Sequence, residues 1–388
     1  MRRSIVLLAT LVGAGLSACA DAPPSTAPAA SIPELALRQE GGQSGSTGRV
    51  FTLSNQPSGN AVLAYPRNAD GSLGAPTSYP TGGRGTGGGL GNQGAVVLDE
   101  RGRYLYAINA ASNEISVFRV RAAGLSLVQT VPSGAAEPIS LTTHDDLLYV
   151  LHDGGNAQVN GFRIDDGRLR ALAGSTRRLT TASGVVDPAQ VGFTPDGDAL
   201  IVTEKASNQL VSFRVRGDGR VGDARVTMSH GATPFGFAVT PNGTLLVSEA
   251  FGGAPDASAL SSYGVGRRGM LQLVSGSVGT TETAACWVVT THDGRFAYLT
   301  NTGSGTVSGF AVAADGSVAL LTPGGITGNS GMGSGPIDAV ITRDDQFLYV
   351  LNGRTHAIAT FRVRADGGLD ALFTTPGLPI GANGLATE

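Results

Sequence analysis

The stretch that decides the fold is DPAQVGFTPDGDALIVTEKASNQLVSFRV, residues 187–215. An apolar strand meets a Pro-Asp-Gly turn at residues 195–197, and a second apolar strand then ends in the polar Glu204. A polar turn at Asn208 leads to a third strand, which closes on Phe213. Because Asp-Gly supplies the positive φ that tight hairpin turns need, the stretch predicts consecutive antiparallel strands.

The closing aromatic residue recurs along the chain at a nearly constant interval. It can be followed as Tyr65, Phe118, Phe162, Phe213, Tyr263, Phe310 and Phe361, with spacings of 53, 44, 51, 50, 47 and 51 residues. Apolar runs such as residues 147–151 are continuous, which is expected where neighbouring blades cover both faces of a sheet. Seven repeats of three or four short strands predict an all-β protein, a seven-bladed β-propeller rather than a solenoid.

The two ends of the repeat region are complementary. Residues 49–55 match the second strand of the repeat with no first strand before them, and residues 381–387 match a first strand with nothing after it. We therefore expect one domain, residues 49–388, whose first blade is completed by the C-terminal strand. This pairing would protect both strand edges.

Composition excludes several classes of protein. The chain carries 27 Lys and Arg against 30 Asp and Glu, so no basic field is available for nucleic acid, and Lys205 is its only lysine. Two cysteines, Cys19 and Cys286, exclude a disulfide scaffold and a cysteine-rich zinc site. We expect a monomer that binds no nucleic acid and no cofactor, with a divalent cation in the propeller tunnel left open.

The N-terminus has the pattern of an export signal. Arg2 and Arg3 precede an apolar run at residues 5–16, and LSAC at residues 16–19 resembles a bacterial lipobox, although an ordinary signal peptide with an incidental cysteine would read similarly. We expect residues 1–19 to be a lipoprotein signal peptide with Cys19 as the lipidated residue, and residues 20–48 to be a flexible linker. The protein would then be exported to the cell envelope and touch the membrane only through its lipid.

Residues 49–388 resemble the lactonase-type seven-bladed propellers, which include bacterial 6-phosphogluconolactonases and fungal carboxymuconate lactonizing enzymes. The resemblance is carried by the Pro-Asp-Gly turn (195–197) and by the motifs YLYAIN (104–109), YLTN (298–301), VSGF (307–310) and YVLN (349–352). It implies a catalytic histidine at the start of an inner strand, assisted by an acid and arginines. Ala189 stands at the histidine position, whereas Glu204 matches the acid. Alanine cannot shuttle a proton, which argues against lactonase chemistry.

Propeller geometry places the start of each inner strand and the end of each second strand on one face, around the axis. The strand ends offer one polar residue per blade: Asn55, Asn109, His152, Glu204, Glu249, Asn301 and Asn352. We expect Glu204 to be the acid or base of any chemistry, and a ligand to be bound by Gln190, Lys205, Glu249, Trp287, Asp338, His152, Asn301 and Asn352. Such oxygens suit a hard cation or sugar hydroxyls, but they also suit backbone groups where a strand turns.

Two functions from different classes remain open. The first is a binding module of the cell envelope, whose partner is a small molecule, a glycan or an envelope protein. The alternative is a lactone hydrolase or cycloisomerase acting on a sugar-acid-like lactone. The glycine-rich run GGRGTGGGLG at residues 82–91 lacks the Gly-Lys-Ser/Thr of a phosphate loop, and we expect a flexible loop near the tunnel that could act as a lid.

Overall fold

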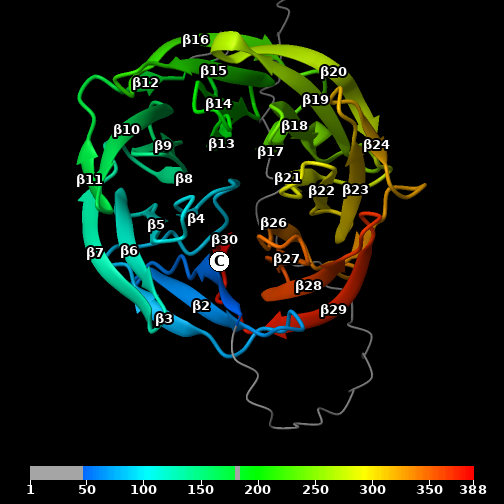
Figure 1. The fold of residues 1–388 in the computed structure, drawn as a ribbon, viewed down its shortest axis with the longest axis horizontal. Coiled ribbons are helices and arrows are strands. Elements are labelled where there is room, and N and C mark those ends of the chain that lie inside the picture. The colour runs from blue at the N-terminus through cyan, green and yellow to red at the C-terminus, as the bar shows by residue number, and fades with distance from the viewer. Residues whose placement is uncertain (1–46, 180–183) are drawn as a thin grey trace, which may run out of the picture.

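The computed structural model describes residues 47–179 and 184–388. Its strands form seven antiparallel sheets of four or five strands, arranged as blades around a central axis (Figure 1). The predicted all-β, seven-bladed propeller is confirmed. Cys19, the expected signal peptide and nearly all of the expected linker lie outside the described residues, so those predictions remain predictions. In the part that is described, no helix is long and apolar enough to cross a membrane.

Blade 1 joins the two ends of the domain. Its strands lie in the order β3 (Thr77–Pro80), β2 (Ala61–Arg67), β1 (Gly48–Leu53) and β30 (Asn383–Thr387). The last strand is therefore the innermost one, and it pairs antiparallel with β1. Arg49 and Glu388 form an ion pair at 2.6 Å that fixes the final residue. The ring closes as the sequence predicts.

The other six blades follow in chain order, each from its inner strand outward. Blades 2, 3 and 4 consist of β4 (Val96–Leu98), β5 (Tyr104–Asn109), β6 (Glu114–Arg121) and β7 (Gly124–Pro132); β8 (Pro138–His144), β9 (Leu147–His152), β10 (Gln158–Asp165), β11 (Arg168–Ala171) and β12 (Arg177–Arg178); and β13 (Pro188–Phe193), β14 (Ala199–Glu204), β15 (Gln209–Val215) and β16 (Val221–Met228). Blades 5, 6 and 7 consist of β17 (Pro234–Val239), β18 (Thr244–Glu249), β19 (Ala259–Gly266) and β20 (Met270–Gly279); β21 (Ala285–Thr290), β22 (Phe296–Asn301), β23 (Thr306–Val312), β24 (Val318–Leu320) and β25 (Gly328–Asn329); and β26 (Pro336–Ile341), β27 (Phe347–Asn352), β28 (Ala357–Val363) and β29 (Leu369–Pro376). Two 3-10 turns, η1 (Phe251–Gly253) and η2 (Arg267–Gly269), lie in blade 5.

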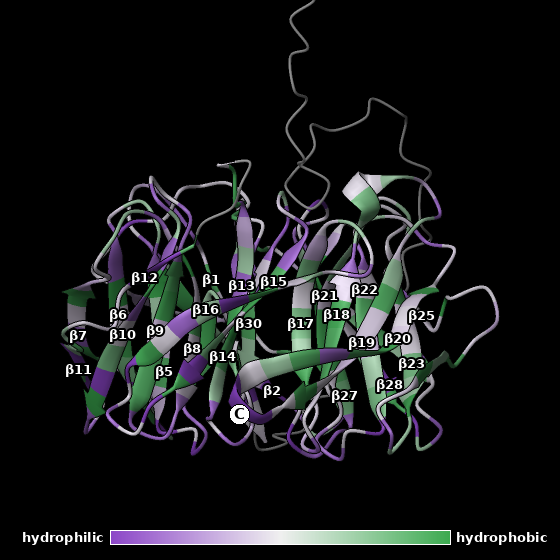
Figure 2. Cartoon of the chain, turned by 90° about the horizontal axis from the view of Figure 1, so that it is seen from above, coloured by the Kyte–Doolittle hydropathy of each residue, from purple (hydrophilic) through white to green (hydrophobic). Residues whose placement is uncertain are grey.

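Apolar side chains fill the space between blades. Every residue of β9 is buried, as the continuous run Leu147–Leu151 predicts. The seven closing aromatic residues are all buried as well, from Tyr65 to Phe361. Figure 2 shows the hydrophobic colour concentrated in the strands and the hydrophilic colour mostly in the loops at both rims. The repeat read from the sequence is therefore the packing unit of the core.

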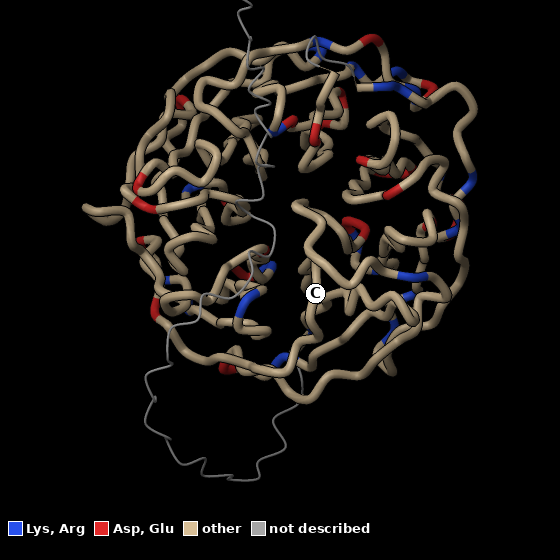
Figure 3. Tube along the Cα trace, turned by 180° about the vertical axis from the view of Figure 1, so that it is seen from behind, with Lys and Arg blue, Asp and Glu red and all other residues tan. Residues whose placement is uncertain are grey.

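Charged residues are spread around the ring. Lys and Arg positions alternate with Asp and Glu positions in Figure 3, without a continuous field of one sign. This distribution agrees with the formal net charge of −3. It gives no support to a nucleic-acid surface.

Candidate ligand site at the tunnel mouth

A repeated turn builds the face on which the inner strands begin, called the mouth face below. In five blades the residue before the inner strand has a positive φ of 46–63°, and these residues are Glu137, Asp187, Thr233, Ala284 and Gly335. Its carbonyl accepts a hydrogen bond of 2.8–3.0 Å from the residue that follows the second strand, and these donors are Asp153, Lys205, Ala250, Thr302 and Gly353. The turn therefore holds the residue after each second strand beside the start of the inner strand.

Asn55 bonds to Thr86 and Gly88 in the β3–β4 connection, but the other polar residues at the strand ends lie inside the ring and not at its mouth. Asn109 Oδ1 accepts a bond from Thr81 Oγ1 at 2.6 Å, and Asn301 Nδ2 donates to Ser308 Oγ at 2.9 Å. Glu249 accepts bonds from Gly231 N at 2.7 Å and from Ser261 Oγ at 2.5 Å. All of these partners lie toward the outer strands or in the loops between blades.

His152 and Glu204 are fully buried in the same way. Burial lowers the pKa of His152 to about 4, so its imidazole is neutral at pH 7. Burial also raises the pKa of Glu204, whose Oε2 accepts a bond from Ser207 Oγ at 2.6 Å. His152, Glu204, Glu249, Asn301 and Asn352 expose at most 1% of their surface. As the structure stands, a ligand at the mouth would not reach these five predicted site residues.

Lys205 does lie at the mouth, and protein atoms surround its ammonium group. Nζ donates to Gly91 O at 2.9 Å and to Pro188 O at 3.3 Å, and it lies 3.0 Å from Asp187 Oδ1. It also sits 4.8 Å from the centroid of the Phe235 ring. An ammonium group has three donors, so all of them are used. The only lysine of the chain therefore fastens three backbone or side-chain oxygens together.

One of those oxygens belongs to the glycine-rich segment, residues 82–94, called the mouth loop below. The β3–β4 connection reaches toward the centre of the ring in Figure 1. Trp287 Nε1 donates to Asn92 O at 2.6 Å, and the Gln93 amide bonds both backbone groups of Val288, at 3.2 and 3.4 Å. The loop leaves blade 1 and is held by blades 4 and 6. It therefore lies over the tunnel.

The predicted inner-strand residues bridge neighbouring blades. Gln190 accepts a bond from Phe237 N at 2.6 Å and donates to Phe237 O at 3.0 Å. Asp338 accepts bonds from Ala339 N at 2.8 Å and Leu385 N at 3.0 Å, and burial raises its pKa to about 8. Both residues line a cavity of about 380 Å³ between the inner strands. Trp287 is buried, with its ring centroid 5.0 Å from that of Phe235.

Asp153 is a mouth residue that the sequence analysis missed. It occupies the place in blade 3 that Lys205 occupies in blade 4, since each donates its N–H to the carbonyl of the residue before the inner strand. Burial raises the pKa of Asp153 to about 6, Lys205 lowers it, and Asp187 and Glu137 raise it further. Aligning the residue after each strand end, and not the strand end itself, would have found it.

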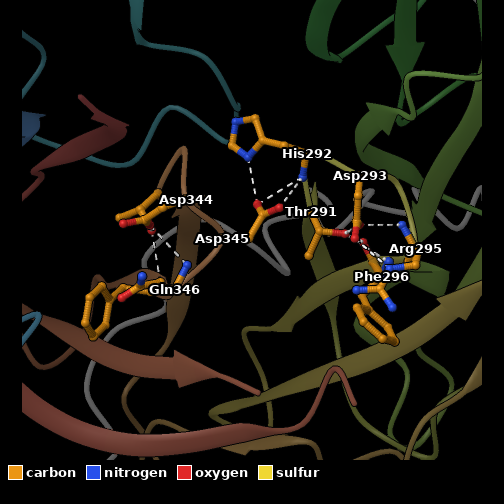
Figure 4. Close-up of polar contacts among 10 residues, drawn as sticks. Thr291, His292, Asp293, Arg295, Phe296, Asp344, Asp345 and Gln346 are labelled. Carbon is orange, nitrogen blue, oxygen red and sulfur yellow. Dashed lines mark hydrogen bonds and ion pairs between the residues drawn. The ribbon is translucent and has the colours of Figure 1, made fainter. Parts of the chain in front are cut away.

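The opposite face carries other histidines. His292 lies in the turn between β21 and β22, and its Nδ1 is 2.7 Å from Asp345 Oδ1 in the next blade (Figure 4). His144 ends β8 on that face, 3.2 Å from Glu100 Oε1. Neither residue has a place at the tunnel mouth.

Comparison with known proteins gives the family. Residues 53–175, 142–253 and 269–379 match the family model described as "Lactonase, 7-bladed beta-propeller". The chain belongs to this lactonase family. No curated protein matches the chain in sequence.

Solved structures agree on the fold of this lactonase-family chain. A protein from Lactobacillus plantarum has a TM-score of 0.68 at 18% identity, covering 88% of this chain and 100% of its own. The periplasmic gluconolactonase of Pseudomonas aeruginosa has a TM-score of 0.68 at 17% identity, covering 87% of this chain and 98% of its own. A Bacteroides fragilis protein provisionally described as a 6-phosphogluconolactonase has a TM-score of 0.64 at 18% identity, covering 90% and 100%. Identities this low establish a shared fold and leave the activity open.

Proposed function

We propose that this lactonase-family propeller is an exported binding module of the cell envelope, and that its ligand is a carboxylated, polyhydroxylated small molecule. The observation that carries the proposal is the environment of Lys205. Its side chain is 93% buried at the tunnel mouth, where it holds the carbonyl of Gly91 in the mouth loop. The Gly91 carbonyl is the one acceptor on Lys205 that belongs to the mouth loop, so an anion could take its place if the loop moved.

A ligand carboxylate would replace the loop on Lys205. A charged acceptor makes a shorter and stronger bond to an ammonium group than a neutral carbonyl does. Displacement of Gly91 and Asn92 would free one donor of the Lys205 ammonium and the Trp287 Nε1–H at once. The rings of Phe235 and Trp287 would then offer an apolar surface to the carbon skeleton of the ligand.

The strand-end acids favour binding over catalysis. Ala189 stands where the family histidine is expected, and Glu204 and Glu249 are both buried against serine hydroxyls. That His152, Asn301 and Asn352 bind a ligand stays a prediction. Because these side chains are buried, the surrounding strands would have to move before a ligand could reach them. Gln190 and Asp338, by contrast, already line the cavity between the inner strands.

Export and lipidation at Cys19 belong to the same proposal. Support comes from the lipobox-like residues 16–19 and from the similar fold of a gluconolactonase described as periplasmic. An exported protein would meet free sugar acids and glycan fragments. Labelling with a palmitate analogue should mark the wild type and not Cys19→Ser, whereas equal labelling would remove the anchor.

Lactone hydrolysis is the second candidate, because Asp153 has a pKa of about 6 beside Lys205. A carboxylate that titrates near neutrality can take a proton from water, and an ammonium group can stabilise the oxyanion that forms on a lactone carbonyl. In this candidate Asp153 replaces Glu204 as the base. The substrate would be the lactone of the same sugar acid that the binding proposal assigns.

One set of titrations tests both candidates. We expect D-gluconate to bind and D-glucose not to bind by isothermal titration calorimetry, and Lys205→Gln to weaken gluconate at least tenfold. Arg214→Gln removes a positive charge from an exposed position of β15 and should leave the affinity unchanged. Hydrolysis of D-gluconolactone above background that is lost in Asp153→Asn would establish the enzyme. Wild-type protein that binds neither gluconate nor other sugar acids would contradict the proposal.

A further inference from the structure

A second cavity lies between blades 2 and 3, on the face opposite the mouth. It measures about 470 Å³ and is lined by five carboxylates: Asp99, Glu100, Asp145, Asp146 and Asp166. Arg101 and Arg103 are the cations in its lining, and two tyrosines, Tyr104 and Tyr106, line it as well. The tunnel-mouth site uses none of these residues.

A tyrosine in the second strand seals the equivalent boundary in three other places. Tyr149 donates its hydroxyl to Gly219 O at 2.9 Å, Tyr298 to Gly367 O at 2.9 Å, and Tyr349 to Gly71 O at 2.8 Å. Each glycine lies in the turn before the outermost strand of the neighbouring blade. A repeated side-chain bond therefore closes these boundaries.

Tyr106 occupies the same position of the repeat and lacks this bond. Tyr106 is fully buried and lines the cavity, and its hydroxyl has no hydrogen-bond partner among the described residues. The turn of blade 3 is engaged by Tyr104 instead, whose hydroxyl donates to Asp166 Oδ1 at 2.7 Å. The Tyr104 ring also packs on Gly167, where an added Cβ would lie 2.1 Å from it. A buried hydroxyl without a partner is costly, so a donor that reached this oxygen through the cavity would be stabilised.

The carboxylates that line this cavity differ in their hydrogen-bond and ion-pair partners. Asp99 accepts bonds from the backbone of Arg103 and Tyr104, and Asp146 forms an ion pair with Arg163 at 2.5 Å. Asp145, in contrast, is 80% exposed and its nearest cationic atom is a histidine nitrogen at 3.7 Å. Asp99 faces Arg103, Asp146 faces Arg163 and Glu100 faces His144, so the negative charge that remains in the lining is carried by Asp145 and Asp166.

We propose that this cavity binds a small organic cation that carries a primary ammonium group. Its N–H donors match the oxygen of Tyr106 and the carboxylates of Asp145 and Asp166. Amino sugars and polyamines share this chemistry.

The test is calorimetric titration of the full chain with spermidine and with D-glucosamine. D-Glucose and D-gluconate serve as neutral and anionic probes. We expect at least one amine to bind, with an affinity that falls as salt is added, and neither other probe to bind at this cavity. Spermidine binding alone would assign polyamines, and glucosamine binding alone would assign amino sugars.

Matched variants separate the cavity from general surface charge. Tyr106→Phe and Asp145→Asn should each weaken the amine at least fivefold. Tyr149→Phe, which alters the sealed equivalent of Tyr106, and Asp223→Asn, which removes an exposed acid from β16, should leave its affinity unchanged. Thermal melts establish that each variant is folded at the titration temperature. The proposal is overturned if neither amine binds, if Tyr106→Phe and Asp145→Asn both bind normally, or if Asp223→Asn weakens binding as much as Asp145→Asn.

Discussion

The mouth face and the opposite face of this propeller are built from the same repeat. The residues that depart from the repeat differ between the two faces in their hydrogen-bond partners. At the mouth, two charged residues, Asp153 and Lys205, break the pattern after the second strands. Lys205 lowers the pKa of Asp153 and donates a hydrogen bond to the mouth loop. On the opposite face, Tyr106 breaks the pattern because its hydroxyl has no hydrogen-bond partner within residues 47–179 and 184–388. Departures from the repeat therefore mark both candidate sites. The mouth loop covers the Lys205 site, whereas Tyr106 lines the cavity between blades 2 and 3.

Closure of the ring underlies both faces and should give the largest effect. Deletion of residues 382–388 removes β30 and the Arg49–Glu388 ion pair. The hydrogen-bonding edge of β1, which now pairs with β30, would then be exposed to the tunnel. We expect loss of the cooperative thermal transition, measured by circular dichroism, because the innermost strand of blade 1 is gone. A truncated protein that melts at the wild-type temperature would contradict the shared blade.

The mouth side should respond to pH through Asp338. Burial raises the folded pKa of Asp338 to about 8 from the usual 3.8 of an aspartate, so the folded state prefers the protonated carboxyl. This contribution to stability is fully present below the unfolded pKa and is lost as pH rises from about 4 to about 8. We expect the melting temperature of the wild type to fall over that range more steeply than that of Asp338→Asn. Parallel slopes in the two proteins would show that Asp338 is ionised in the fold.

How far sequence reasoning reached differs between the blades and the site. The closing aromatic residues and the strand-swapped first blade followed from spacing alone, because hydrophobic periodicity and edge pairing leave few alternatives. The sequence did not predict that the polar side chains at the strand ends point into the ring and away from the mouth. Bulges between Pro188 and Gln190, and between Pro336 and Asp338, shift the register of the inner strands, and a one-residue shift exchanges the two faces of a strand. Glu204 is the last paired residue of β14 and is buried, whereas Lys205 is the residue that follows the strand and lies at the mouth.

Replacement of Lys205 should loosen the mouth loop. Lys205→Gln leaves Gly91 O, Pro188 O and Asp187 without their shared donor, which should cost about 1–3 kcal/mol of stability. Amide hydrogen exchange should accelerate in residues 88–94 and stay unchanged in the Tyr106 cavity. Unchanged exchange in the loop would mean that Trp287 and Gln93 hold it without Lys205.

The tyrosine pair should give the smallest effect. Tyr149→Phe removes the bond to Gly219 O and should destabilise the fold by about 1 kcal/mol, whereas Tyr106→Phe removes a hydroxyl without a partner and should cost nothing or stabilise. Urea unfolding of both variants measures the difference. Equal losses in the two would show that Tyr106 is bonded in solution and would close the open site.

The most direct test of the mouth site is a crystal structure of the full chain with D-gluconate. The account predicts the ligand carboxylate on Lys205 Nζ in the place of Gly91 O, residues 88–94 displaced, and the sugar chain against Phe235 and Trp287. Gluconate bound elsewhere, with Gly91 and Asn92 still held by Lys205 and Trp287, would contradict it.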